Sequence, residues 1–250
     1  MSIVSKYFNK NINELKLLSN VQNKALNGDI QSQMAMSQHY KNDLNNQDGA
    51  LYWYKKLADT NNVDMIFNLA VTYDNNNMYD DAIPLYKKAA TLGSISAHYN
   101  LAIIYERGYG GHRDYKKAIE LYTYAAEHGH TSAMYNLAIL YENTNNPYYN
   151  DNKCLYWYQQ ACENGVGDAQ FNLGYIYENG EHGLKIDHYK AFQLYQDALS
   201  NNIYKAYTNL GMCYYNGWGT RVDKRKAKEY LEKSVAHGST IAQKALNELF

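Results

Sequence analysis

The 250-residue sequence has little proline, little cysteine and no excess of charge of either sign. Its 2 prolines argue against Pro-rich disorder, extended linkers and all-β folds with many Pro-containing turns. Its 24 Lys and Arg residues nearly balance 25 Asp and Glu residues, which argues against the basic surface of a nucleic-acid-binding protein. The 3 cysteines, Cys154, Cys162 and Cys213, are an odd number and favour reduced thiols in the cytoplasm, the nucleus or a host cytosol.

Long hydrophobic runs are also missing. The segment 1–16 contains no run of seven apolar residues, so we expect no secretory signal peptide. No segment approaches the ~18 consecutive apolar residues that a transmembrane helix needs. We therefore expect neither a nucleic-acid partner nor a membrane partner.

Tyrosine, by contrast, is abundant, and it recurs in a repeating pattern. A first module ends in Tyr, as in 97–105 (AHYNLAIIY) and 133–141 (AMYNLAILY). A second module begins with Ala or Cys and ends in Gly or Asn, as in 118–129 (AIELYTYAAEHG). Both modules occur six times, in phase, at intervals of 32 to 37 residues. Two modules that share one period indicate an internal structural repeat.

Both modules have the apolar spacing of an α-helix, as Ala97, Leu101, Ile104 and Tyr105 illustrate. One helix pair cannot bury both of its faces, so successive pairs must stack. The predicted fold is an all-α solenoid of about six antiparallel helix pairs with a single capping helix at each end. The expected segments are an N-terminal capping region at 1–28, repeats at about 29–61, 62–93, 94–129, 130–165, 166–202 and 203–238, and a C-terminal capping helix at 239–250.

The repeat unit consists of Leu-Gly/Ala followed by Tyr, a Gly-containing loop that ends in Asp, and then Ala, Tyr and Ala-Ala before Gly. Its clearest loops are 105–118 (YERGYGGHRDYKKA) and 214–227 (YYNGWGTRVDKRKA). This pattern resembles the Sel-one-like repeat, a relative of the tetratricopeptide repeat, over residues 29–250. The first two repeats are shorter, lack Gly-x-Gly and drift toward the tetratricopeptide form. The resemblance implies a right-handed superhelix and a scaffold or adaptor function.

No motif for a catalytic nucleophile, a phosphate loop or a metalloprotease site occurs in the sequence. We therefore expect no enzymatic activity, no catalytic residues, no cofactor and no metal site. His128 and His130 could be read as metal ligands, but no third ligand stands near them, and His128 suits the end of a helix. Cys162 stands at a place for small packing residues, which favours a buried, unreactive thiol.

A recurring surface is the better candidate site, because the resemblance implies that the first helices line a concave groove. Asn amides can bond an extended peptide backbone, and aromatic faces can hold its side chains. An alternative stays open, in which each Asn instead bonds between stacked helices. The acids after each closing Tyr, such as Asp74 and Glu142, could favour basic partners, but they are interpreted as solvated helix ends. The candidate partner-binding residues are Phe67, Asn68, Tyr99, Asn100, Ile103, Tyr135, Asn136, Ile139, Phe171, Asn172, Tyr175, Asn209 and Met212.

The sequence thus predicts a non-enzymatic interaction scaffold whose groove binds a protein or peptide of unknown identity. The sequence does not determine the oligomeric state, and a monomer is favoured. One alternative is β-lactam binding or a hydrolase-like activity, as in cysteine-rich bacterial relatives of the repeat family. The regular cysteine pairs of those relatives are missing here. Another alternative is a structural subunit of an assembly that associates through its end helices.

Overall fold

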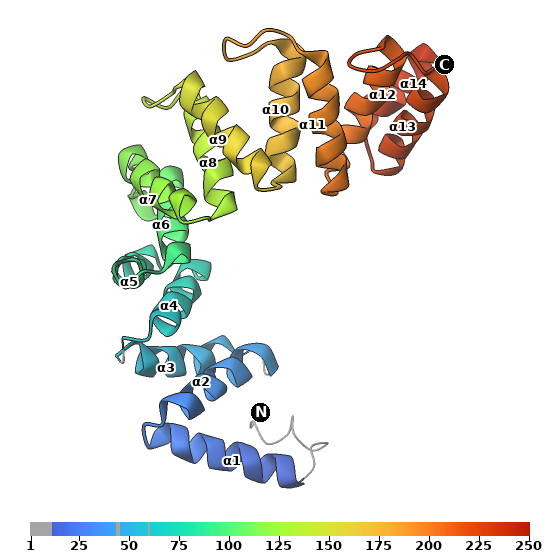
Figure 1. Cartoon of the computed structure of the whole chain (residues 1–250). Helices are drawn as coiled ribbons and strands as arrows, with labels where there is room; N and C mark the ends of the chain where they lie inside the picture. The colour runs from blue at the N-terminus through green and yellow to red at the C-terminus, as the bar shows by residue number, and fades with distance from the viewer. Residues whose placement is uncertain (1–11, 44–45, 60) are drawn as a thin grey trace. The chain divides into compact units, whose positions relative to one another are not determined.

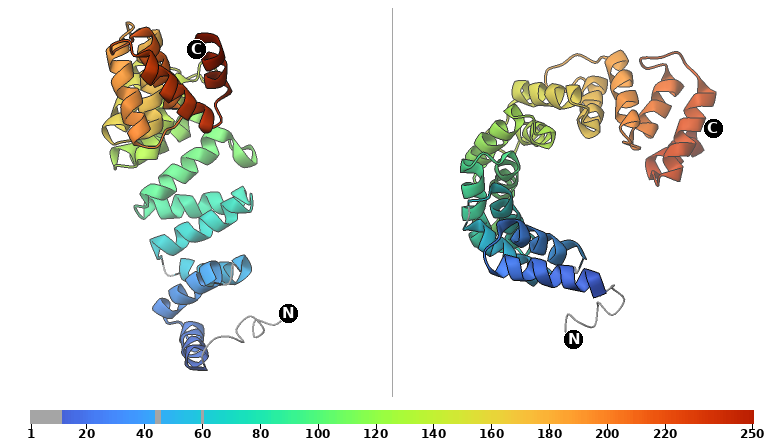
Figure 2. Two further views of the ribbon diagram at one scale, coloured as in Figure 1. Left: turned by 90° about the vertical axis from the view of Figure 1, so that its right-hand side faces the viewer. Right: turned by 60° about the horizontal axis from the view of Figure 1, so that its bottom comes forward.

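The computed structural model describes residues 12–43, 46–59 and 61–250. These residues form α-helices joined by short turns and loops, and no β-strand occurs among them. The contacts divide the chain into two compact units, Met1–Asp114 and Tyr115–Phe250. Within each unit every helix packs against the next one along the chain (Figure 1, Figure 2). The predicted all-α solenoid of helix pairs is therefore confirmed.

The first unit contains six α-helices in its described residues. A π-helical segment, His39–Asp43, extends the second of them, and a 3₁₀ turn, Tyr109–Gly111, follows the sixth. The helices are α1 (Ile12–Leu26), α2 (Ile30–Gln38), α3 (Gln47–Ala58), α4 (Val63–Asn75), α5 (Tyr79–Thr91) and α6 (Ile95–Arg107).

The second unit contains eight α-helices. They are α7 (Tyr115–Glu127), α8 (Thr131–Glu142), α9 (Asp151–Glu163), α10 (Gly167–Asn179), α11 (His188–Ser200), α12 (Ala206–Asn216), α13 (Lys224–Ala236) and α14 (Thr240–Leu249). Even-numbered helices correspond to the first module of the repeat and odd-numbered helices to the second. Helix α1 lies in the predicted capping region 1–28, whose residues 1–11 are outside the described part of the chain, and α14 lies in the predicted segment 239–250.

Four of the second helices, α3, α9, α11 and α13, begin at an acidic or amide side chain. The Asp187 carboxylate accepts from the Lys190 backbone N–H at 3.0 Å, and Asp223 accepts from that of Lys226 at 3.0 Å. These contacts satisfy backbone donors that the first turn of a helix leaves without an intrahelical partner. Asp151 lies in the first turn of α9, where negative charge is favourable.

The second helices end where the chain turns into the left-handed backbone region. Glycine adopts this conformation without strain, and Asn tolerates it better than most other residues. Gly129 has φ +87°, and Asn202 takes the same conformation with φ +65°. The predicted glycine and asparagine helix ends are therefore confirmed, which explains why the repeat needs no proline at this place.

The core of each unit consists of large side chains from one helix that fill spaces beside small residues of another. Leu101 and Leu137, which occupy the same place in successive first helices, are buried. Ala102 and Ala138 beside them are fully buried and let neighbouring helices approach. Among the described helices, none is both long and apolar enough to span a bilayer.

Candidate functional site

A buried tyrosine hydroxyl connects three helices of the first unit. Tyr86, in α5, is fully buried, and its hydroxyl donates to Asp74 Oδ2 at the end of α4 over 2.9 Å. The same hydroxyl accepts from Asn100 Nδ2 of α6 over 3.1 Å. Burial raises the pKa of Tyr86 and also that of Asp74, although the tyrosine hydrogen bond opposes the shift of Asp74. The interpretation of Asp74 as a solvated helix end is therefore wrong, because its carboxylate accepts a buried donor.

The second unit repeats this acid–tyrosine–asparagine arrangement. The Tyr158 hydroxyl donates to Glu142 Oε2 over 2.7 Å and accepts from Asn172 Nδ2 over 3.1 Å. The Glu142 carboxylate is therefore also a hydrogen-bond acceptor for a buried tyrosine, and not only a solvated helix end. Further contacts of this kind are Asn136 Nδ2 to the Tyr122 hydroxyl at 3.2 Å, Asn209 Nδ2 to the Tyr195 hydroxyl at 3.1 Å, and the Tyr195 hydroxyl to Glu178.

The three places change together in the C-terminal repeat. Tyr215 stands at the place of the acid, Leu231 at the place of the tyrosine and Ala245 at the place of the asparagine. Leu231 is as deeply buried as the tyrosines that it replaces. A leucine offers no hydroxyl with which an acid or an amide could form a hydrogen bond. In the first repeat, in contrast, the acid place holds Lys41 while Tyr54 and Asn68 are kept, so the tyrosine and the asparagine recur together and the acid does not always accompany them.

Four of the predicted Asn residues, Asn100, Asn136, Asn172 and Asn209, lie inside this network. The two N–H groups of Asn172 donate to Tyr135 and Tyr158, and those of Asn209 donate to Glu178 and Tyr195. The bonding between stacked helices that the sequence left as an alternative is therefore present. An asparagine with both donors engaged has only its carbonyl oxygen left for a partner.

The predicted aromatic residues pack on the buried tyrosines. Ring centroids lie 5.9 Å apart for Phe67 and Tyr86, and 5.6 Å apart for Phe171 and Tyr195. Tyr175, at 47% exposure, is the most accessible member of the predicted set. The half-buried members are Phe67, Asn68, Tyr99, Asn100, Ile103, Tyr135, Asn136, Ile139, Phe171, Asn172, Asn209 and Met212.

Three predicted residues meet at a pocket of about 610 Å³ in the second unit. Phe171 and Tyr175 of α10 and Asn209 of α12 line it together with Tyr204 and Ile241. Tyr204 is 43% exposed and Ile241 is 72% exposed. The pocket therefore presents an accessible aromatic and aliphatic wall.

The rim of this pocket is polar. Lys205 Nζ lies 4.3 Å from the centroid of the Phe171 ring and 3.0 Å from Asp168 Oδ1. The Thr208 and Ser234 hydroxyls are 2.7 Å apart. An apolar wall with polar groups at its edge is the usual composition of a recognition pocket.

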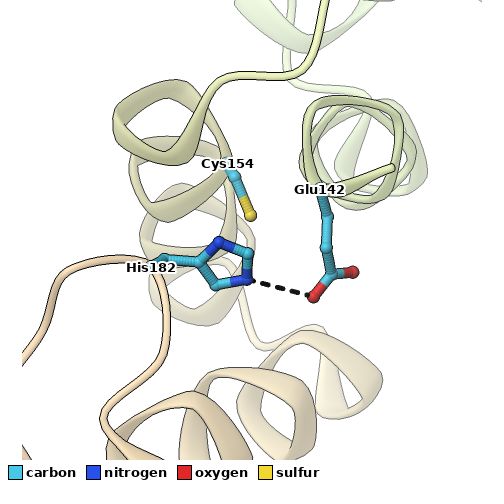
Figure 3. A group of neighbouring side chains, drawn as sticks. All are labelled: Glu142, Cys154 and His182. Atoms are coloured by element: carbon cyan, nitrogen blue, oxygen red, sulfur yellow. Dashed lines mark ion pairs between the residues drawn. The ribbon is translucent and has the colours of Figure 1, made fainter. Parts of the chain in front are cut away.

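A different cluster forms where α8 ends and α9 begins. Glu142, Cys154 of α9 and His182 of the loop before α11 turn their side chains toward one another (Figure 3). His182 Nε2 lies 3.6 Å from Glu142 Oε1, and one ligand atom from each of the three residues lies within 4.8 Å of the other two. The other ring nitrogen, Nδ1, contacts Asp151. Hydrogen bonds from Tyr149 and from His182 lower the pKa of Asp151.

The three cysteines are unpaired, and two of them, Cys154 and Cys213, are buried. Burial raises the pKa of all three thiols, including the half-buried Cys162, to about 12. A thiol nucleophile reacts as the thiolate. Nearby carboxylates raise the pKa of each thiol further, so none of the three has the electropositive surroundings of an activated nucleophile.

His128 acts at a helix end, as its position predicts. Its Nδ1 lies 2.8 Å from the Tyr124 backbone oxygen in the last turn of α7. Its ring stacks on that of Tyr124 at 4.1 Å between centroids. These contacts explain His128 without a bound metal.

Comparison with known proteins decides the family. The Sel1 repeat family model matches residues 31–62, 95–130, 131–166, 167–202 and 205–239, well over half of the chain. The chain belongs to the Sel1 repeat family. A tetratricopeptide repeat model matches residues 66–94 of this Sel1 repeat protein, which is the second of the two repeats expected to drift toward that form. The first repeat, in contrast, matches the Sel1 model.

Solved structures of other Sel1 repeat proteins share the fold. A protective antigen of uropathogenic Escherichia coli with an SLR fold aligns over 93% of this chain and 51% of its own, with 24% identity and a TM-score of 0.82. The present chain thus spans about half of that antigen's length. A Sel1 repeat protein from Oxalobacter formigenes aligns over 92% of this chain and 68% of its own, with 25% identity and a TM-score of 0.75. Among curated proteins, none matches the sequence.

The cluster of Glu142, Cys154 and His182 joins two successive Sel1 repeats, and the sequence did not predict it. Cys154 and His182 belong to different repeats, so they form none of the short motifs by which metal ligands are recognised. These two residues could have been recognised in the sequence because they differ from the residues at the equivalent places of other repeats. Cys154 stands where other repeats carry Ala, and His182 stands where other loops carry Gly.

Proposed function

We propose that this Sel1 repeat protein is a non-enzymatic scaffold that binds an extended segment of a partner protein. Sel1 repeats generally mediate protein–protein interaction. The observation that supports a specific surface is the pocket of about 610 Å³ at Phe171, Tyr175 and Asn209. Its volume lies within the range of pockets that enclose a large side chain or a small ligand.

The chemistry of the pocket suits a partner that inserts a large apolar or aromatic side chain. Exposed tyrosines offer a wide, rigid contact area at low cost in conformational entropy, and they are common among residues that dominate binding energy. Tyr175 of α10 and Tyr204 of the turn before α12 can contact such a side chain from two sides of the pocket. The Asn209 carbonyl oxygen, left over from the internal network, can accept from a backbone N–H of the partner.

We also propose that the protein acts as a monomer in a reducing compartment such as the cytoplasm, of its own cell or of a host. Three unpaired thiols fit such a compartment, where disulfides are rare. Size-exclusion chromatography coupled to light scattering tests the monomer directly.

The experiment selects peptides from a displayed random library on the full chain and measures their affinity by fluorescence anisotropy. Tyr175→Ala removes an exposed ring from the pocket, and we expect it to weaken the selected peptides about 10-fold or more. Tyr189→Ala is the matched control, because Tyr189 is 64% exposed on α11 and does not line the pocket. Circular dichroism checks that both variants fold.

Peptides that bind the wild type and Tyr175→Ala equally well would show that the partner uses another surface. Tyr175 is a better test position than Asn136, because the Asn136 amide donates to the Tyr122 hydroxyl. A change at Asn136 would lower stability together with binding and so confuse the two effects.

A further inference from the structure

The cluster of Glu142, Cys154 and His182 combines three kinds of metal ligand from three parts of the second unit. Glu142 closes α8, Cys154 lies near the start of α9, and His182 lies in the loop between α10 and α11. Carboxylate, thiolate and imidazole are together the ligand types of Zn²⁺. Ligand atoms around a tetrahedral zinc ion lie about 3.3 to 3.6 Å apart. The 3.6 Å between His182 Nε2 and Glu142 Oε1 agrees with that spacing.

Neighbouring residues orient two of these ligands. Asp151 contacts His182 Nδ1, which leaves Nε2 facing Glu142, and the Tyr149 hydroxyl donates to Asp151 over 2.6 Å. Tyr158 donates to Glu142 Oε2, which leaves Oε1 facing the histidine. A carboxylate behind a metal-binding histidine is the usual second layer of a zinc site, since it sets the tautomer and the direction of the ring.

Two departures from the repeat meet at this point. Cys154 takes the place that Ala82, Ala118 and Ala191 hold in other repeats. His182 takes the place of the second glycine of Gly-x-Gly, held elsewhere by Gly110 and Gly219.

The backbone conformation at His182 is a further indication that its side chain has a specific role. Gly110 and Gly219 have φ +62° and +67°, and His182 has φ +52°. A non-glycine residue in the left-handed region is uncommon and costs energy that glycine avoids. The side chain at this place therefore has a role that glycine could not fill, and its neighbours are a thiol and two carboxylates.

We propose that Glu142, Cys154 and His182 bind one Zn²⁺ ion that clamps the Sel1 repeat at 131–166 to the one at 167–202. Three protein ligands leave a fourth position for water. The half-exposed Glu142 carboxylate marks the side from which the ion enters. The fully buried sulfur of Cys154 forms the opposite side.

The experiment titrates Zn²⁺ alone into the reduced, metal-free full chain by isothermal titration calorimetry. Co²⁺ absorption then reports the ligands, because a bound thiolate produces a sulfur-to-cobalt charge-transfer band. We expect one Zn²⁺ per chain, a cobalt spectrum with the thiolate band, and a higher melting temperature with Zn²⁺.

Cys154→Ala and His182→Gly each introduce the residue of the equivalent places in other repeats, so both variants should fold. Each should weaken Zn²⁺ about 100-fold or more, and Asp151→Asn about 10- to 100-fold. Cys162→Ala and Glu178→Gln are matched controls that should keep wild-type affinity. They remove a thiol of the same helix and the corresponding acid of the next repeat.

Absence of Zn²⁺ binding by the wild type would overturn the proposal. So would a wild-type cobalt spectrum without the thiolate band, or Zn²⁺ affinity unchanged in Cys154→Ala. Circular dichroism of the metal-free variants separates a lost ligand from a lost fold.

Discussion

Removal of one buried hydroxyl tests the idea that Asp74, Tyr86 and Asn100 hold three helices together. Tyr86→Phe keeps the ring and its packing, and it deletes only the group that donates to Asp74 and accepts from Asn100. Because Tyr86 is fully buried, water does not replace the hydroxyl at its own position. The substitution therefore isolates the polar contribution of the network.

The expected loss in the free energy of unfolding follows from the two hydrogen bonds that Tyr86→Phe removes. A hydrogen bond to a charged group contributes about 1.5–3 kcal/mol, and a neutral one about 1 kcal/mol. Asp74 and Asn100 are only half-buried, so each regains part of this loss by bonding to water. We expect Tyr86→Phe to lower the free energy of unfolding by about 1.5–3 kcal/mol, which corresponds to roughly 3–12 °C in melting temperature for a chain of this size.

The loss should also depend on pH. The Tyr86 bond favours the ionised form of Asp74 and lowers its pKa, whereas burial raises that pKa. The bond therefore stabilises the fold at pH values above the pKa of Asp74 and contributes less as pH falls through it. Tyr86→Phe should accordingly destabilise the protein more at neutral pH than below about pH 4.

Urea denaturation followed by circular dichroism at both pH values measures this difference. Tyr54→Phe is the matched control, because the acid place of that repeat holds Lys41, which cannot accept from a hydroxyl. It should have a smaller effect with little pH dependence. Equal stability of Tyr86→Phe and wild type, or a loss that is the same at both pH values, would refute the reasoning.

Two further substitutions test packing. Leu137→Ala deletes a side chain with 0% exposure and should lower the free energy of unfolding by about 2–5 kcal/mol; a wild-type melting temperature would mean that the repeat register is wrong. Gly219→Ala would place a Cβ 2.2 Å from the His188 backbone oxygen at φ +67°, and it should destabilise by about 1–3 kcal/mol or more in the same thermal assay. Gly111→Ala, with φ +85° and no atom within 4 Å, has similar backbone strain without the clash and should cost less.

The helix pairs, their ends and their register could be predicted because local sequence determines them. The left-handed turns at Gly129 and Asn202 and the cap at Asp187 each depend on residues only a few places apart. The apolar period of each helix gives its buried face, and the in-phase repeat requires the faces to stack. The Sel1 resemblance rests on the same recurring residues, and the comparison confirmed it.

The polar pairing inside the stack could not be predicted in the same way. Helical spacing tells which face Asp74 lies on, but it does not tell that a hydroxyl 12 residues later lies within 2.9 Å of it. For the same reason, helical spacing did not predict the contact between Cys154 and His182, which belong to different repeats. Such contacts depend on how one helix pair sits on the next, and side-chain periodicity carries no information about that.

Residues that recur in each repeat and residues that differ from the repeat pattern have different roles in this protein. Asn68, Asn100, Asn136, Asn172 and Asn209 recur in every repeat that also has the buried tyrosine, and the asparagine is lost where the tyrosine becomes Leu231. An asparagine that recurs in this way has a role common to these repeats, which is to stabilise the stacking of one helix pair on the next. A binding function that differs from one Sel1 protein to another has to come from residues that the repeat does not require. We propose that in this chain those residues are the exposed Tyr175, Tyr204 and Ile241 around one pocket, and Cys154 and His182, which meet beside Glu142.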